Sequence, residues 1–441
     1  MRDIALFILI FSILPFVFKK PFIGVLLFTW VSLMNPHRLT YGAAYDFPFA
    51  AVIVVVTLIS LLVSNQKKNF PVTGLTITLL VFVTWMTLTT FYALEPTRAW
   101  AEWSRVMKTM ILVAVILLTI NTKQEIQALA WTIGLSLGFF GFKGGVFTIL
   151  SGGSSHVFGP EGSYITDNNA LALALVTALP LIWYVQLSVT QKILRYGFIG
   201  LTMLTVIAAV GSYSRGALLG GAAMFFFLWL KNRQKIRTGI ILLLIVVVIY
   251  AVMPAQWFDR MHTIDNYQQD SSALGRINAW GFAINVASAN LMGGGFDCFT
   301  NRLFVVYAPE PYNQHAAHSI YFQVVGEHGF VGISLFLLFM FLAWRTGTRV
   351  LKFCKDREDL KWASDLAAMC QVSIIGYAIG GAFLTLAYYD LYYDIVAVLI
   401  LLEKLLLSKD SLTSNATAEP EATAITASNV DLTIRVPQQT P

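Results

Sequence analysis

Apolar residues occur in long runs along almost the whole chain, and short polar segments separate them. Most runs hold roughly 17–25 residues, which is enough for a helix to cross a hydrocarbon core of about 30 Å. A backbone in lipid must satisfy its hydrogen bonds internally, so such runs predict helices, whereas barrel strands would alternate apolar and polar residues. We predict an all-α, polytopic integral membrane protein of about 12 to 13 transmembrane helices. The runs cover residues 4–18, 21–34, 47–64, 73–92, 106–120, 126–149, 168–187, 195–211, 215–230, 237–253, 318–343, 366–387 and 390–407. The first two are short enough to form a hairpin or one interrupted helix.

Positive charges alternate between successive connections, which predicts the topology. Connections rich in Lys and Arg belong in the cytoplasm by the positive-inside rule. They are Lys19-Lys20, Lys67-Lys68, Lys123, Lys192 with Arg195, 231–237 and 345–361. The other connections then face the periplasm or the cell exterior: 35–46, 93–105, 150–167, 211–215 and 254–317. The largest polar segment, 254–317, therefore lies on the side of the membrane away from the cytoplasm.

Composition supports this topology and excludes several function classes. Hydrophobic residues make up 57% of the chain and charged residues 12%, about half the charged share of soluble domains. The net charge of +6 does not predict nucleic-acid binding, because no basic cluster with interleaved aromatics occurs. The three cysteines are too scattered for a disulfide framework or a metal site. The first apolar run lacks a small-residue cleavage site, so we expect no cleavable signal peptide.

We divide the chain into four parts. Residues 1–150 form N-terminal transmembrane helices, and 151–345 form a second domain that contains the long periplasmic loop 254–317. Residues 346–407 form C-terminal transmembrane helices. The tail 408–441 is rich in Ser, Thr, Ala and Pro and lacks apolar periodicity, so we expect it to be disordered and cytoplasmic.

Segment 254–317 is far longer than an ordinary connection. It contains an amphipathic stretch, Ala279–Ala289, a Gly293–Gly295 break and several aromatic residues. We expect short amphipathic helices on the outer face of the membrane that form a lid over a cavity. A passive loop is the alternative.

Two arginines on the periplasmic side are candidates for binding an anion. Arg215, in Ser212–Gly216, lies at the outer edge of a span and departs from the positive-inside trend. Charged groups at such positions usually face a wet cavity or bind an anion, although an arginine can also extend toward lipid phosphates. Arg276 is expected to open the amphipathic helix of the loop, where a guanidinium beside free backbone N–H groups would bind a diphosphate. An ordinary surface charge is the alternative for Arg276.

His318 is the candidate general base, where the long loop re-enters the membrane. The unperturbed pKa of histidine, about 6.5, suits proton abstraction at neutral pH. His315 is three residues away and could share a helical face, but no nearby Asp or Glu completes a metal-ligand set, so we expect no metal. A structural hydrogen-bonding role is the alternative for His318.

Two further polar sites are read as structural. Glu327 lies about two and a half turns beyond His318 and is expected to brace a partner helix or cap a turn broken by glycine. Asp167, in Asp167-Asn168-Asn169, is expected to be the N-cap of the span that follows. The Gly-rich loop before it could also line a glycan path.

Taken in order, these pieces resemble the O-antigen ligase and polymerase superfamily of bacterial membrane glycosyltransferases. The resemblance covers about residues 160–345. It rests on Asp167–Ala170, Ser214-Arg215-Gly216, Gly275-Arg276 with Trp280, Gly293–Phe296, and Ala317–Gln323 leading to Glu327–Gly329. The N-terminal part, with Met34–Arg38 and Trp100–Arg105, is similar to O-glycosylation ligases linked to exosortase systems.

The resemblance implies a substrate and a site. The donor would be a glycan on an undecaprenyl-diphosphate carrier at the outer leaflet, transferred with inversion and without metal or other cofactor. Arg215 and Arg276 match the diphosphate-binding arginines of the family, and His318 matches its catalytic histidine. Ser214, Asn168, Tyr321 and Glu327 lie in the same motifs as supporting residues. The other partners would be membrane lipids and a glycan, lipid or protein acceptor.

Two other functions stay open at this stage. A glycan polymerase would use the same donor with a second lipid-linked glycan as acceptor, and any acceptor hydroxyl could meet the same base. A transporter for lipid-linked glycans is the second alternative, although no internal repeat is evident and the marked residues gather at one face. A membrane scaffold would leave the two arginines without a role.

Overall fold

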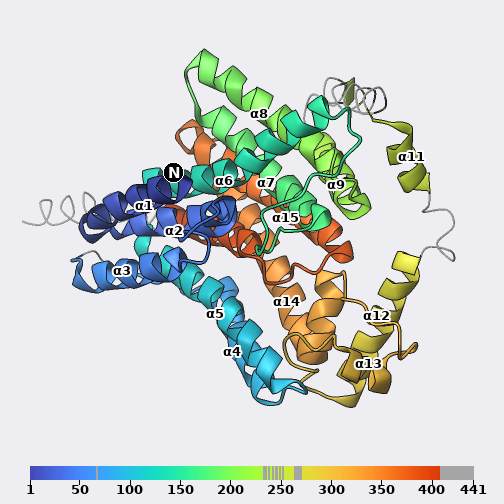
Figure 1. Ribbon diagram of the computed structural model, residues 1–441. Coiled ribbons are helices and arrows are strands. Elements are labelled where there is room, and N and C mark those ends of the chain that lie inside the picture. The colour runs from blue at the N-terminus through green and yellow to red at the C-terminus, as the bar shows by residue number, and fades with distance from the viewer. Residues whose placement is uncertain are drawn as a thin grey trace, which may run out of the picture.

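The computed structural model describes residues 1–65, 68–231, 253–262 and 271–407, with isolated positions between 232 and 252. These residues form helices joined by loops, with no strand among them (Figure 1). The helices are α1 (Arg2–Lys19), α2 (Pro21–Met34), η1 (Pro36–Leu39), α3 (Phe49–Val63), α4 (Gly74–Phe91), α5 (Pro96–Thr119), α6 (Lys123–Leu150), α7 (Asn168–Ser188), α8 (Lys192–Val210), α9 (Arg215–Lys231), α11 (Ala255–His262), α12 (Ser271–Ala289), α13 (Asn301–Tyr307), α14 (Ile320–Phe353), η3 (Glu358–Leu360), α15 (Lys361–Gly380) and η4 (Gly381–Phe383). Residues 390–407 are also helical.

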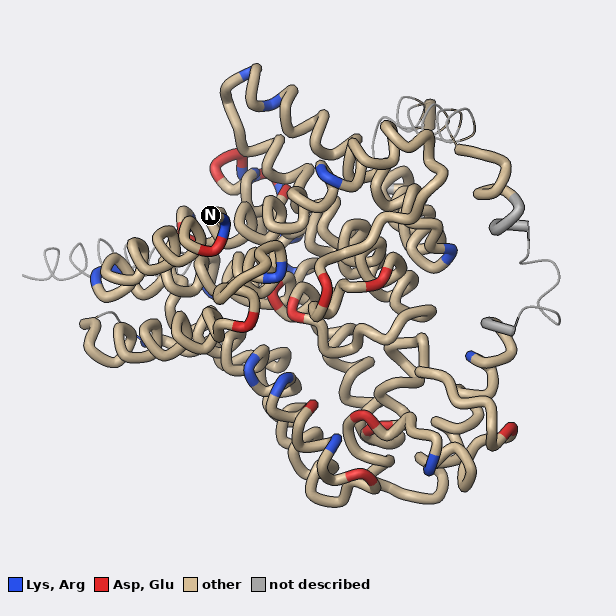
Figure 2. The backbone as a smooth tube through the Cα atoms, in the orientation of Figure 1, with Lys and Arg blue, Asp and Glu red and all other residues tan. Residues whose placement is uncertain are grey.

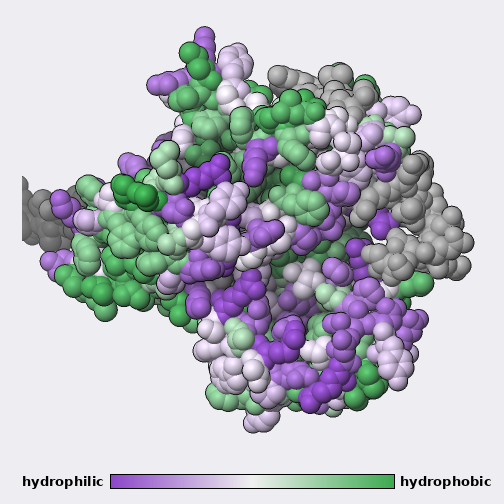
Figure 3. Space-filling view, in the orientation of Figure 1, coloured by the Kyte–Doolittle hydropathy of each residue, from purple (hydrophilic) through white to green (hydrophobic). Residues whose placement is uncertain are grey.

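The predicted fold class, an all-α polytopic membrane protein, is confirmed. Six helical segments of the described chain have the length and apolar composition to cross a membrane: Gly74–Phe91, Lys123–Leu150, Asn168–Ser188, Lys192–Val210, Ile320–Phe353 and Glu358–Phe383. Three shorter apolar helices accompany them, at Pro21–Met34, Phe49–Val63 and Arg215–Leu230. Figure 2 shows long stretches of these helices without charge, and Figure 3 shows apolar surface over α1 to α3.

Three predicted boundaries were wrong. α14 ends at Phe353, ten residues beyond the predicted end at 343. α5 begins at Pro96, ten residues before the predicted start at 106, because its first turns are amphipathic rather than uniformly apolar. α15 ends at Gly380, whereas the predicted span ran to 387; a short 3-10 turn and a non-helical stretch intervene before residue 390. The predicted span 237–253 falls mostly outside the described residues, as do Lys67, most of the connection 231–237 and the tail 408–441.

α6 and α8 approach each other closely because glycines on α6 face α8. A Cβ added at Gly141 would lie 2.1 Å from Thr205 Oγ1, and one added at Gly145 would lie 2.3 Å from the carbonyl oxygen of Leu204. Such small residues let helix backbones pack closely in a membrane, where lipid is as apolar as the side chains. α6 leads directly into the loop 151–167, which belongs to the candidate site.

The long helix α14 is broken at Gly329, whose φ of 67° interrupts the helical hydrogen bonds. The carbonyls released by the break find other partners, as backbone groups away from water require. Gly294 N–H donates to Gly326 O (2.8 Å) and Gly295 N–H donates to Glu327 O (2.9 Å). Gly293 must be glycine at this crossing, because its φ is 69° and a Cβ would lie 2.6 Å from the nitrogen of Gly329.

The predicted loop helices form a packed unit beside α14. α12 packs against α14, and α13 packs against α12, on the side of the molecule away from α1 to α3 (Figure 1). They enclose an apolar core of their own that includes Phe282, Phe299, Phe304 and Val325. The loop is therefore built around packed helices, and the predicted stretch Ala279–Ala289 lies within α12. Whether this unit acts as a lid stays a prediction.

Replacing Gly145 with alanine tests the α6–α8 contact. The added methyl group must displace the backbone carbonyl of Leu204, so we expect a loss of about 1–3 kcal/mol in the free energy of unfolding. Gly200→Ala on α8 is the matched control, since no atom lies within 4 Å of its added Cβ. It should be neutral or slightly stabilising, because alanine favours helix over glycine. Thermal unfolding in detergent measures both, and equal unfolding midpoints for the two variants would contradict the packing.

Candidate functional site

His318 lies in a constrained turn immediately before α14. Its φ of 40° is in the left-handed region, which residues other than glycine seldom adopt. Two contacts hold the turn: His318 N–H donates to Thr385 Oγ1 (2.9 Å), and Ala317 O accepts from Trp280 Nε1 (2.8 Å). Backbone strain of this kind concentrates at functional sites, where the surrounding structure enforces it. Here α12 and the segment after α15 enforce it together.

Charged and titratable groups from three segments act electrostatically on the imidazole of His318. Burial lowers its pKa below 6.5, and the nearby Arg276 guanidinium and His315 lower it further, while Asp167 acts in the opposite direction. Burial disfavours the charged imidazolium, and a neighbouring positive charge does the same. His318 is therefore neutral at pH 7 and can accept a proton.

The position of Arg276 in its helix differs from the prediction. α12 begins at Ser271, so Arg276 lies more than one turn inside the helix and does not open it. The helix extends upstream because residues 271–274 contain no Gly or Pro that would end it before Gly275. Arg276 is therefore not next to the free N–H groups at the start of α12. It does lie close enough to His318 for its positive charge to lower the pKa of the imidazole.

α12 is anchored to the segment that carries His318. The rings of Trp280 and Phe322 stack at 4.8 Å, and Asn278 binds the backbone of Glu310 and Asn313. Gly275 leaves room for His315, whose ring atoms would lie 2.4 Å from an added Cβ. These contacts bring Arg276 and His318 together across more than forty residues of sequence.

Arg215 is the first residue of α9, so a helix N-terminus lies at this arginine. Ser214 Oγ accepts from Ala217 N–H (3.3 Å), which is the bond of an N-cap. Tyr213 before it has a φ of 61°, its hydroxyl donates to Gly153 O (2.5 Å), and its ring lies 4.5 Å from that of His156. The Gly-rich loop therefore fixes the turn that presents Arg215.

Two short contacts bring the Arg215 turn and the His318 turn to one region. Asp167 is the N-cap of α7, as predicted, and its Oδ1 accepts from Asn169 and Ala170 N–H (2.9 and 3.0 Å). The next residue, Asn168, donates to Ser212 O (2.7 Å) in the Arg215 turn. Since Asp167 also acts electrostatically on His318, the start of α7 lies near both turns.

The segment after α15 makes the second connection. Gly216 packs against Phe383, and Thr385, two residues later, holds His318. Both turns therefore lie against residues 383–385, and both lie near the start of α7.

The predicted supporting residues use their polar atoms within the fold. Ser214 caps α9, Asn168 binds Ser212, and the Tyr321 hydroxyl donates to Ala378 O (2.7 Å). Glu327 is buried, and its carboxylate accepts from Asp297 N–H (3.1 Å) and from the Tyr388 hydroxyl (2.6 Å). These bonds position the segments that carry Arg215 and His318.

Three contributors were missed by sequence reasoning. Thr385 holds the His318 backbone, Asp167 approaches the imidazole as well as capping α7, and His156 stacks on Tyr213. Sequence spacing gave no signal for Thr385 or His156, because both act across long separations. Asp167 was recognised only as a cap.

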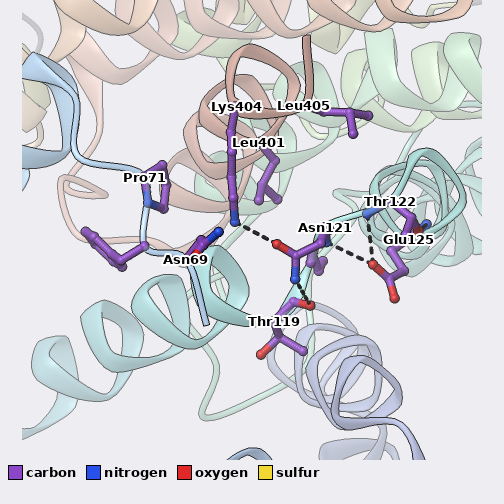
Figure 4. Close-up of a pocket in the computed structure, with 11 residues that line it drawn as sticks. Asn69, Pro71, Thr119, Asn121, Thr122, Glu125, Leu401, Lys404 and Leu405 are labelled. Carbon is purple, nitrogen blue, oxygen red and sulfur yellow. Dashed lines mark hydrogen bonds between the residues drawn. The ribbon is translucent and has the colours of Figure 1, made fainter. Parts of the chain in front are cut away.

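An apolar cavity of about 650 Å³ adjoins the Arg215 turn. In the described part of the chain it is lined by α7, α8, α9 and Trp257, and it reaches Ala217 and Leu218, just after Arg215. A second cavity of about 550 Å³ lies elsewhere, where Lys404 donates to Asn121 Oδ1 and Glu125 accepts from Thr122 N–H (Figure 4). None of the candidate residues lines that second cavity.

Comparison with known families agrees with the sequence reading. Residues 198–337 match the family described as O-Antigen ligase, and this range contains Arg215, Arg276 and His318. Residues 1–190 match a family of unknown function, DUF5935. No curated protein matches the chain. The resemblance to the O-antigen ligase and polymerase superfamily is thus confirmed, and the finer likeness to exosortase-linked ligases stays a prediction.

Replacing Arg276 with glutamine tests the electrostatic contact with His318. Loss of the positive charge favours the imidazolium, so the pKa of His318 should rise. Diethyl pyrocarbonate modifies neutral imidazole, and mass spectrometry of the His318 peptide over a pH series gives the midpoint. Arg302→Gln is the control, because Arg302 binds Leu94 O and Glu95 instead. An unchanged midpoint in Arg276→Gln would place the guanidinium too far from His318 to matter.

Proposed function

We propose that this membrane protein with an O-antigen ligase domain is a glycosyltransferase that acts at the periplasmic face of the bacterial inner membrane. It transfers a glycan from an undecaprenyl-diphosphate carrier to an acceptor hydroxyl. The observation that carries the proposal is that Arg276 and Asp167, from two other segments, lie within electrostatic range of His318 in its strained turn. The match of residues 198–337 supports the reaction class.

Arg215 and Arg276 hold the diphosphate of the donor. Cleavage of the sugar–phosphate bond develops negative charge on the leaving diphosphate, and guanidiniums bind such oxygens bidentately. Positive groups fixed in advance at that position stabilise the transition state without reorganisation. Arg215 adds the N-terminus of α9, whose N–H groups and dipole favour an anion.

His318 removes the proton from the acceptor hydroxyl as that oxygen attacks the anomeric carbon. The C–O bond to the acceptor forms while the bond to the diphosphate oxygen breaks, and the proton ends on the imidazole. A base must be unprotonated to do this, and burial beside Arg276 keeps the pKa of His318 low. The strained turn fixes the ring in place, which reduces the entropy lost on reaching the transition state.

The apolar cavity beside the Arg215 turn is suited to the isoprenoid chain of the carrier. It is lined by aliphatic and aromatic side chains of α7, α8 and α9. A chain bound there would leave its diphosphate at the level of Ser214 and Arg215, where α9 begins. Remote binding energy of this kind can be used to orient the reacting groups.

Transfer by the purified protein tests the assignment. Labelled lipid-linked glycan is incubated with a protein, a lipid A core or a second lipid-linked glycan as acceptor, and the third arm detects a polymerase. We expect His318→Ala to lower the transfer rate about 10²–10⁴-fold, the usual contribution of a general base. Arg276→Ala should also lower it, whereas Arg345→Ala, about seven turns beyond His318 in the last part of α14, should not.

A normal rate of product formation by His318→Ala would refute the role of the histidine. Movement of unmodified lipid-linked glycan across vesicle membranes, without transfer in any arm, would instead identify a transporter.

The pH dependence of transfer gives a second test. The rate should fall as the pH drops through the His318 pKa, which lies below 6.5, and should stay level above it until another group titrates. In Arg276→Gln the residual rate should begin to fall at a higher pH, because His318 protonates more readily there. A rate that rises on acidification would exclude an imidazole base.

A further inference from the structure

Two aspartates that the transfer site does not use lie one turn apart on the final helix, within a repeated sequence. Tyr388-Tyr389-Asp390 is followed by Leu391 and then by Tyr392-Tyr393-Asp394. Residues four apart share a helix face, so both carboxyl groups lie on the same side of helix 390–407. Both side chains are buried, with exposed fractions of 5% and 0%.

Both carboxylate oxygens of Asp390 accept hydrogen bonds. One carboxylate oxygen accepts from Thr109 Oγ1 of α5 (2.5 Å), and the other accepts from Ser32 of α2. Arg105 of α5 lies close enough to act on it electrostatically. Arg105 also pairs with Glu102 (3.7 Å), so the hydrogen bonds from Thr109 and Ser32 are the direct contacts of the Asp390 carboxylate.

Asp394 is not compensated in this way. Neither of its oxygens has a hydrogen-bond partner among the described residues, and the charged group that acts on it is Asp390. A second carboxylate one turn away cannot stay charged in the membrane interior without a cation. Buried charges in proteins are paired or bind metal ions.

Two buried hydroxyl groups near this point also lack partners in the described chain. Tyr389, 3% exposed, interacts electrostatically with both aspartates, and its hydroxyl has no partner. Thr29, 0% exposed, lies one turn before Ser32 on α2, and its Oγ1 has none either.

The directions of the helices place Thr29 at the depth of Asp394. Asp390 binds Thr109 and Lys404 binds Leu117 O, so the final helix and α5 run the same way. α2 runs the opposite way, since Ser32 meets Asp390 near Thr109 while Val25 and Phe28 line a small cavity with Leu112 and Val115. Thr29 lies three residues before Ser32, about 4.5 Å along α2, and Asp394 lies four residues after Asp390, about 6 Å along the final helix. Because the two helices run in opposite directions, both shifts point the same way.

We propose that Asp390 and Asp394 bind a sodium ion, with the hydroxyls of Thr29 and Tyr389 as further oxygen ligands. Hard cations take carboxylate and hydroxyl oxygens, and a monovalent cation would offset the charge of Asp394, whose oxygens have no hydrogen-bond partner among the described residues. A proton would neutralise Asp394 through one oxygen, but it would leave the hydroxyl groups of Thr29 and Tyr389 without partners. A cation can coordinate several oxygens at once.

The bound ion joins α2 to the final helix, which starts directly after the segment that holds His318. The site is independent of glycan transfer, and so is its test.

Thermal unfolding of the detergent-purified full chain tests the proposal. Sodium chloride is compared with N-methyl-D-glucamine chloride at equal ionic strength. Because a ligand that binds the folded state stabilises it, the midpoint of the wild type should rise with sodium and saturate. Asp394→Asn keeps the shape without the charge, so it should lose this dependence and unfold in sodium-free buffer no earlier than the wild type. Asp365→Asn, on α15 and outside the cluster, should keep the full sodium response.

A second variant covers the case in which Asp394→Asn does not fold. Thr29→Val removes one neutral ligand, and it should raise the sodium concentration needed for half of the shift. Equal midpoints in the two salts for the wild type, or a sodium response retained by Asp394→Asn, would overturn the proposal. A midpoint that depends on pH but not on sodium would overturn it as well, by identifying a proton instead.

Discussion

The hydrogen bonds between residues 385–388 and the first half of α14 are the constraint on which the candidate site depends. Thr385 accepts from His318 N–H, Ala387 N–H donates to Gln323, and the Tyr388 hydroxyl donates to Glu327. Each bond satisfies a buried polar group, and leaving any of them unmade costs free energy. Together they fix the start of α14 and hold His318 in its left-handed conformation.

The requirement that buried polar groups form hydrogen bonds also explains how the break in α14 is accommodated. A glycine at 329 releases carbonyls that have no water to bind, and the backbone of Gly294 and Gly295 approaches closely enough to satisfy them. Trp85 completes the set by donating to His328 O. The loop that carries Arg276 is thereby joined to α14, the membrane helix that follows His318.

Much of the architecture could be predicted from the sequence, because lipid imposes strong rules on composition. Long apolar runs gave the helices, Asp167 gave a cap, and Gly293–Gly295 gave a break, all of which depend on local chemistry. The ends of α5 and α15 were misjudged because hydropathy does not register an amphipathic first turn or a helix that stops inside an apolar run. The motif order around His318 indicated the superfamily that residues 198–337 match.

The sequence by itself determined the class of fold and the residue types available for chemistry, since these follow from length, hydropathy and side-chain identity. Tertiary structure decided which of them meet. Arg276 lies inside α12 instead of at its start, and Arg215 is the residue at a helix N-terminus. Asp167 and Thr385, which are distant in sequence, lie near His318. Long-range packing makes these contacts, and neither periodicity nor spacing along the chain encodes which distant residues will face each other across a helix interface.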